Sequence, residues 1–132
     1  MKANARRKYP RKSPTNELTA SIIRYLNLNG CVAWRNNNGA VYDKRIDGYR
    51  KNPLHKKGVP DILGYALNGG RLIAIEVKGT KADYLSPEQT HFIRCANVAG
   101  CISFEARSFE QFITEFCKRT GKEKPFFTKE NY

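Results

Sequence analysis

The sequence is poor in the residues that build metal clusters and disulfide frameworks. It has four cysteines and two histidines in 132 residues, and no two cysteines form a C-x-x-C pair. A zinc site is therefore not expected, and dispersed thiols suit a reducing compartment better than a disulfide framework. We expect the cysteines to pack as small hydrophobic residues.

Long apolar runs are also missing. No stretch approaches the roughly 18 apolar residues of a membrane-spanning helix. The N-terminal sequence MKANARRKYPRK is basic, but no apolar segment follows it as in a secretory signal. We therefore expect a cytoplasmic protein with no membrane partner.

Acidic residues are scarce. The chain has 12 Asp and Glu against 24 Lys and Arg, which gives a net charge of +12 and a pI near 9.8. Such an excess repels itself in a compact fold, and a polyanionic partner is the usual reason to keep it. Nucleic acid is the first partner to consider and an anionic membrane surface the second, and of the two we expect nucleic acid.

The pattern of apolar and turn residues predicts one domain of the α/β or α+β class, with a mixed β-sheet core flanked by helices, and of these we expect α/β. Helices are expected near residues 15–30, 86–100 and 108–121, and an exposed polar loop over 43–57. We expect residues 16–118 to form the domain and 119–132 a tail. Residues 1–15 would be a basic flexible arm that contacts phosphates through Arg6, Arg7 and Lys8, or a solvated tail with no specific role.

Two apolar runs, residues 61–67 and 71–78, meet at Asn-Gly-Gly and predict a β-hairpin. The first run carries Asp61, and the second carries Glu76 and Lys78. Burying such charges among apolar side chains is costly unless each has a partner. Since side chains alternate between the faces of a strand, Glu76 and Lys78 share one face.

The turn decides where Asp61 lies. An Asn68-Gly69 loop sets Asp61 opposite Glu76, a Gly69-Gly70 loop sets it opposite Lys78, and a three-residue loop without a bulge would separate the charges. Asn-Gly is the strongest short hairpin signal, so we favour the first register. Two opposed carboxylates repel, and a divalent cation such as Mg²⁺ would remove the conflict. The alternative is a salt bridge between one carboxylate and Lys78 at the end of the sheet.

These residues resemble the motif of the PD-(D/E)XK nucleases. Pro60-Asp61 matches its first half and Glu76-Val77-Lys78 its second half. A longer succession resembles the VRR-Nuc branch, particularly its small stand-alone, phage-type members, over roughly residues 16–116. It comprises Trp34-Arg35-Asn36, Asn38-Gly39-Ala40, Lys57-Gly58-Val59-Pro60-Asp61, Ile75-Glu76-Val77-Lys78, and Ser86 with Gln89.

The resemblance implies a restriction-endonuclease-like core and a metal-dependent DNA endonuclease that hydrolyses phosphodiester bonds. By position, Asp61, Glu76 and the Val77 backbone carbonyl would bind Mg²⁺ or Mn²⁺, and Lys78 would orient the attacking water. Stand-alone members of the branch are homodimers associated with cutting four-way (Holliday) junctions. The expected setting is therefore a bacterial or phage-infected host cell, with branched DNA as the partner.

Further site residues follow from the resemblance or from local charge. Glu17 corresponds to an acidic residue that the family often carries on its first helix, and Gln89 to a glutamine on the helix after the core hairpin, so both are candidate catalytic residues. Each also has a structural explanation: a first-turn carboxylate favoured by the helix dipole for Glu17, and a capping box with Ser86 for Gln89. The other expected nucleic-acid contacts are Arg35 and Asn36, which would otherwise shape a turn, and the basic pair Lys56 and Lys57.

Two other functions remain open. The chain would be a nucleic-acid-binding module if it kept the nuclease fold without turnover, although the intact Asp61, Glu76 and Lys78 favour catalysis. It would be a nuclease with a different target if it cut flap or duplex DNA in repair or restriction. The sequence contains no recognisable target-reading domain, which disfavours site-specific restriction.

Overall fold

A computed structural model of the chain describes residues 13–36, 41–50 and 54–121. The predictions for Arg6, Arg7 and Lys8 lie outside the described residues, as does most of the expected tail. The elements in chain order are α1 (Pro14–Leu28), β1 (Cys31–Arg35), β2 (Val41–Asp43), β3 (Gly48–Arg50), β4 (Ile62–Ala66), β5 (Leu72–Val77), α2 (Pro87–Val98), β6 (Ile102–Ala106) and α3 (Phe109–Thr120).

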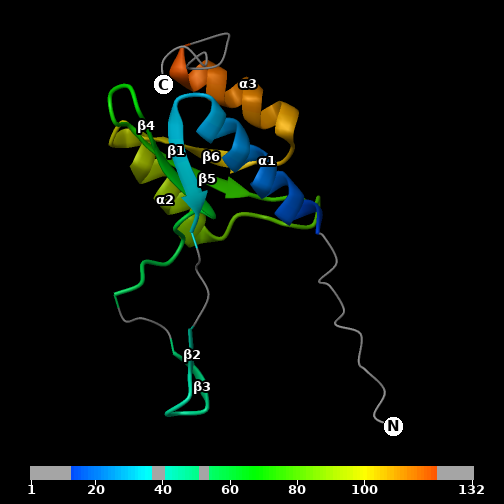
Figure 1. Ribbon diagram of the computed structural model, residues 1–132, viewed down its shortest axis with the longest axis vertical. Coiled ribbons are helices and arrows are strands. Elements are labelled where there is room, and N and C mark those ends of the chain that lie inside the picture. The colour runs from blue at the N-terminus through cyan, green and yellow to red at the C-terminus, as the bar shows by residue number, and fades with distance from the viewer. Residues whose placement is uncertain (1–12, 37–40, 51–53, 122–132) are drawn as a thin grey trace.

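The core is a four-stranded mixed sheet in the order β1-β4-β5-β6, flanked by helices (Figure 1). β1 pairs with β4 and β4 with β5 in antiparallel fashion, whereas β6 runs parallel to β5. The parallel pair needs a crossover connection, and α2 supplies it. The prediction of an α/β fold with a mixed sheet and flanking helices is confirmed.

The two faces of the sheet differ in chemistry. One face is the main apolar core, where α1 and α3 pack on the sheet through Ile22, Leu26, Phe112 and Phe116. The alternate residues of β5 and β6 face α2. There the Asn97 side chain donates to the Ser103 carbonyl at 2.8 Å and accepts from the Ser103 N–H at 3.3 Å. This second face carries Glu76 and Ser103, two of the polar residues that are buried in the described part of the chain.

The helix ends follow the signals in the sequence. Pro87 begins α2, and Ser86 caps it in a reciprocal capping box with Gln89. Ser108 caps α3, and Gly121 ends it in the left-handed conformation that glycine adopts without steric cost. Ser13 caps α1, so this helix begins at Pro14.

The described residues of the segment 43–57 are mostly exposed, as predicted, but they do not all form an unstructured loop. β2 and β3 form a short antiparallel hairpin in which Tyr42 opposes Tyr49, with ring centroids 5.6 Å apart. Asp43 binds Arg50 across the strands at 3.0 Å and also Arg45 in the turn. These cross-strand contacts, which a count of polar residues does not reveal, order the hairpin, and Figure 1 shows it standing away from the main sheet.

The central hairpin has the favoured register but a different turn. Ile62 pairs with Ile75 and Tyr65 with Leu72, so continuing the pairing places Asp61 opposite Glu76. The turn is a four-residue loop, closed by the Ala66 N–H bond to the Arg71 carbonyl at 3.0 Å. Leu67 instead donates its N–H to the Gly30 carbonyl, which takes Leu67 out of the ladder. Compared with the expected Asn68-Gly69 turn, the loop includes one more residue from each strand. The remaining residues therefore pair in the same register.

Candidate active site

Three charged side chains gather where the central hairpin ends, on the face covered by α2. Asp61 directly precedes β4, Glu76 lies near the end of β5, and Lys78 follows β5. Glu76 is only 2% exposed, and Asp61 and Lys78 are half-buried. The predicted placement of the three charges on one face agrees with the structure.

Asp61 is held by backbone groups on both sides. Its Oδ2 accepts a hydrogen bond from the Val77 N–H at 3.2 Å. Its carbonyl accepts from the Asn36 N–H at 2.7 Å, and the Asn36 side chain donates to the Pro60 carbonyl at 3.3 Å. Asn36 therefore extends the contact between β1 and β4 and positions the Pro60-Asp61 pair.

Glu76 has three charged or polar neighbours and one oxygen without a hydrogen bond. Gln89 Nε2 donates to Glu76 Oε1 at 3.0 Å, and Lys78 Nζ lies 3.5 Å from the same oxygen. Glu76 Oε2 is buried and accepts no hydrogen bond from any residue that the structure describes. A buried carboxylate oxygen without a partner calls for an explanation, and a bound ion or water is the usual one.

The electrostatics of Asp61 and Glu76 agree with this geometry. Burial, followed by the neighbouring Asp61 carboxylate, raises the pKa of Glu76 from its ordinary 4.5 to about 7, and Lys78 offsets part of that rise. Near neutral pH the Glu76 carboxyl is therefore partly protonated in the protein alone. A cation between the two carboxylates would favour the charged form.

The donor set fits a small hard cation. Mg²⁺ is commonly bound by one or two carboxylates, with waters and substrate phosphates completing its shell. Within residues 13–36, 41–50 and 54–121, no three His, Cys, Asp or Glu side chains converge as a metal-binding group. Asp61 and Glu76 would supply two carboxylate ligands to such a cation.

Glu17 is not part of this cluster. It lies exposed in the first turn of α1, in a surface hollow that it shares with Asn16, Ala20, Ser21 and Arg24. Arg35, at the end of β1, binds Asn16 Oδ1 through Nη2 at 2.9 Å and is also exposed. The structure therefore places Glu17 and Arg35 near the start of α1, while Asp61 and Glu76 meet at the hairpin.

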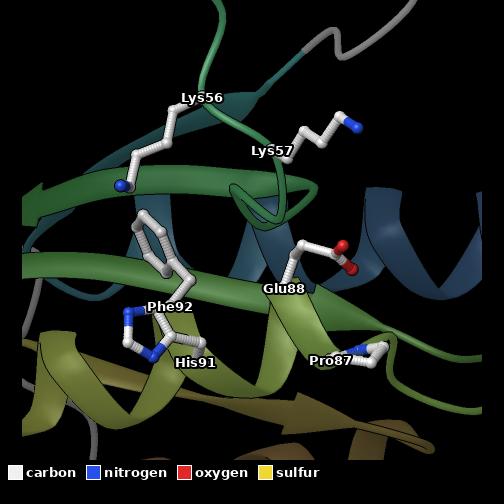
Figure 2. A pocket seen from close by; sticks show the side chains of 6 residues that line it. All are labelled: Lys56, Lys57, Pro87, Glu88, His91 and Phe92. Carbon is white, nitrogen blue, oxygen red and sulfur yellow. The ribbon is translucent and has the colours of Figure 1, made fainter.

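An open hollow of about 340 Å³ leads to Gln89. It is lined by His55, Lys57, Gly58, Val59, Ser86, Glu88 and Gln89. Gly58 has a φ of +83°, and a Cβ there would lie 2.4 Å from the Glu88 carbonyl oxygen. Only glycine lets this loop lie so close to α2, and the contact sets the exposed Lys56 and Lys57 beside the helix (Figure 2).

Sequence reasoning missed the residue that anchors the connection from Lys78 to α2. Arg107 donates to the Thr80 carbonyl at 3.1 Å and to the Asp83 carbonyl at 2.7 Å. It is also ion-paired with Glu105, the residue aligned with Glu76 on the neighbouring strand. An arginine after a strand carries no local signal for this role, because its partners lie more than twenty residues away.

The backbone at Lys78 is fixed from two further directions. Its N–H donates to the Ala106 carbonyl at 2.9 Å, which continues the β5–β6 ladder beyond Val77. The next residue, Gly79, lies against the start of α1, where an added Cβ would come within 2.5 Å of Thr15 Oγ1. Helix α1 and strand β6 thus both determine where the lysine emerges.

One of three comparisons with known proteins gave a match. A family model described as the VRR-NUC domain matches residues 13–110, which include the central hairpin and α2. Neither the curated proteins nor the solved structures gave a match. Among the described residues, no helix is long and apolar enough to cross a membrane. Since the family model covers most of the chain, the protein belongs to the VRR-NUC family and carries a nuclease domain of the PD-(D/E)XK type.

Proposed function

We propose that the protein is a divalent-metal-dependent endonuclease that hydrolyses phosphodiester bonds in structured or branched DNA, with four-way junctions as the expected target. The observation that supports this most directly is Glu76. It is a buried carboxylate beside Asp61 with an unpartnered oxygen, and it contacts both Lys78 and Gln89.

Each residue has a distinct role in the proposed reaction. Asp61, Glu76 and the Val77 carbonyl would hold Mg²⁺ or Mn²⁺. Such a cation, when bound, lowers the pKa of water and polarises a phosphoryl oxygen. The Lys78 ammonium would orient the attacking water and neutralise charge that develops on the phosphate. Gln89 would keep Glu76 in place through its hydrogen bond to Oε1.

The charge of the chain supports a DNA substrate. The net charge of +12 favours a polyanion, and Arg35, at the end of β1, and Lys56 and Lys57, beside α2, are exposed. Arg6, Arg7 and Lys8 would add contacts to phosphates from the arm. We further propose a homodimer, because two matched cuts across a junction need two active sites in a fixed relation. A monomeric mass by light scattering at assay concentration would contradict the dimer.

Cleavage assays test the proposal. Labelled duplex, flap and four-way junction substrates are incubated with Mg²⁺ or Mn²⁺, or with EDTA, and with the wild type, Asp61→Asn or Glu76→Gln. We expect metal-dependent products that both variants lose, and a preference for the branched substrates. Glu110→Gln is the matched control, because Glu110 is an exposed carboxylate in the first turn of α3.

The same assays distinguish the alternatives. If the wild type binds DNA but cuts no substrate, the protein is a binding module on a nuclease fold. If cutting persists in Asp61→Asn, the site lies elsewhere. Glu17→Gln tests the role that family resemblance gives to Glu17, and loss of cleavage with unchanged stability would place this carboxylate in the reaction.

A further inference from the structure

A second hollow adjoins the one that leads to Gln89. It has a volume of about 270 Å³ and is lined by Lys56, Lys57, Pro87, Glu88, His91 and Phe92 (Figure 2). The two hollows share Lys57 and Glu88. Phe92 follows Gln89 by three residues on the same helix, which is an axial rise of about 4.5 Å. The second hollow therefore begins within one helical turn of the proposed site.

The lining combines an aromatic ring with a cationic rim. Figure 2 shows Lys56 reaching toward the half-buried ring of Phe92, with His91 beside it and Lys57 above Glu88. The His91 ring also contacts Cys95, whose Sγ lies 3.5 Å from Nε2. One wall is thus aromatic, and of the two lining lysines Lys56 reaches toward the ring, whereas Lys57 extends away from it (Figure 2).

We propose that this hollow takes one unpaired nucleobase of the DNA strand that the enzyme cuts, stacked on Phe92 with Lys56 and His91 at its edge. The inference rests on the proposed function and names the substrate feature that this site reads. Aromatic side chains stack bases of any sequence, and nearby lysines attract the backbone that carries them.

The observations favour a base over a phosphate or a larger ligand. The Glu88 carboxylate on the rim repels a phosphate, whereas it can accept a hydrogen bond from an exocyclic amino group of a base. The volume lies just below the roughly 300–1,000 Å³ of pockets that hold whole ligands, which suits a fragment such as one base. A fully paired duplex keeps its bases stacked and cannot fill the hollow without unpairing one. DNA with unpaired bases should therefore bind best.

Binding of four DNA substrates tests the inference. They are a fully paired duplex, the same duplex with a three-nucleotide gap, the gapped duplex with abasic sugars opposite the gap, and a four-way junction. Fluorescence anisotropy in Ca²⁺ measures the dissociation constants for the wild type, Phe92→Ala and Phe92→Tyr. We expect Phe92→Ala to lose roughly 5- to 150-fold in affinity for the gapped duplex and little for the paired one. Phe92→Tyr should retain the affinity, and the abasic substrate should reproduce the loss in the wild type.

Controls separate stacking from damage to the fold. Val98→Ala, on an exposed position of the same helix, should bind all substrates as the wild type does. Thermal unfolding of each variant reports its stability. Equal weakening by Phe92→Ala on the paired and gapped duplexes would overturn the inference, as would an abasic substrate that binds the wild type as tightly as the gapped one.

Failure of the proposed function would look different. If the wild type binds the gapped duplex more tightly than the paired one but cuts no DNA in Mn²⁺, the base site stands and the nuclease function is disproved. If the wild type cuts DNA, and Phe92→Ala still prefers the gapped duplex over the paired one as the wild type does, the proposed nuclease function stands and the base site is disproved.

Discussion

The side-chain amide of Gln89 joins the proposed site to the start of α2. Its nitrogen donates to Glu76 Oε1 at 3.0 Å, and its oxygen accepts from the Ser86 N–H at 2.8 Å. The residue that completes the helix cap therefore also orients the buried carboxylate. Any shift of α2 along the sheet would move Glu76 relative to Asp61.

Gln89→Glu separates these two contacts. A glutamate still accepts from the Ser86 N–H, but it offers Glu76 a second carboxylate in place of a donor. We expect cleavage to fall roughly 10- to 100-fold, as is typical when a hydrogen bond to a metal ligand is lost. Single-turnover rates at several Mn²⁺ concentrations measure the effect. Ser108→Ala, which removes the cap of α3, should lower stability by about 1 kcal/mol and leave the rate unchanged. Equal rates in wild type and Gln89→Glu would restrict Gln89 to capping.

Lys78→Ala should separate binding from cleavage. Because the ammonium lies in the site and not on the outer surface, its removal should leave the dissociation constant for DNA within a few-fold of the wild-type value. The single-turnover rate should fall by about 10²–10³, the usual cost of losing one preorganised electrostatic group. Lys118→Ala, at an exposed position of α3, is the matched control. A parallel loss of binding and cleavage would make Lys78 a DNA-contacting residue only.

Glu76 makes the stability of the metal-free protein depend on pH. Its pKa is about 7 in the folded protein against an ordinary 4.5, so the folded state binds more protons between these values. The contribution of this group is therefore most favourable below pH 4.5, and it is lost as the pH rises through 7. Thermal midpoints in EDTA should fall less between pH 5 and 8 for Glu76→Gln than for the wild type. Mn²⁺ at pH 8 should raise the midpoint of the wild type and not that of the variant. Parallel pH curves would contradict the assignment.

Gly79→Ala should disturb the site through the backbone. The added Cβ would lie 2.5 Å from Thr15 Oγ1 and 2.8 Å from Thr15 Cα, so either α1 or the residue after Lys78 must move. We expect a loss of about 1–3 kcal/mol in the free energy of unfolding by urea, with slower cleavage. Gly48→Ala is the control, because its Cβ would have no atom closer than 3.7 Å. Stability equal to that of the wild type would show that this close approach relaxes without cost.

Deleting residues 1–12 tests the arm. These residues contain six basic side chains and no acid. If all six contact phosphates, the slope of log K against log salt should become less steep by up to about five, since each neutralised phosphate contributes roughly 0.9. Affinity should fall for every DNA sequence alike. An unchanged slope would show that the arm has no phosphate role.

Much of the fold and the centre of the site followed from local patterns. Alternation along the two strands predicted that Asp61 and Glu76 share one face. The turn is longer than expected by two residues, one from each strand, so the register and the shared face are unchanged. Serine, proline and glycine marked the ends of α2 and α3, since capping depends on neighbours within a few residues. The charge balance by itself predicted a polyanionic partner.

The tertiary structure decided what depends on distant partners. Arg107 holds a connection more than twenty residues away, Gly79 is set against α1, and Phe92 borders a hollow only because the loop at Gly58 crosses α2. Likewise, the position of Glu17 in the first turn of α1 did not reveal that it lies outside the cluster of Asp61 and Glu76. Periodicity determines which face a side chain shares, because backbone geometry repeats every few residues. Which faces meet is determined by how the helices pack on the sheet.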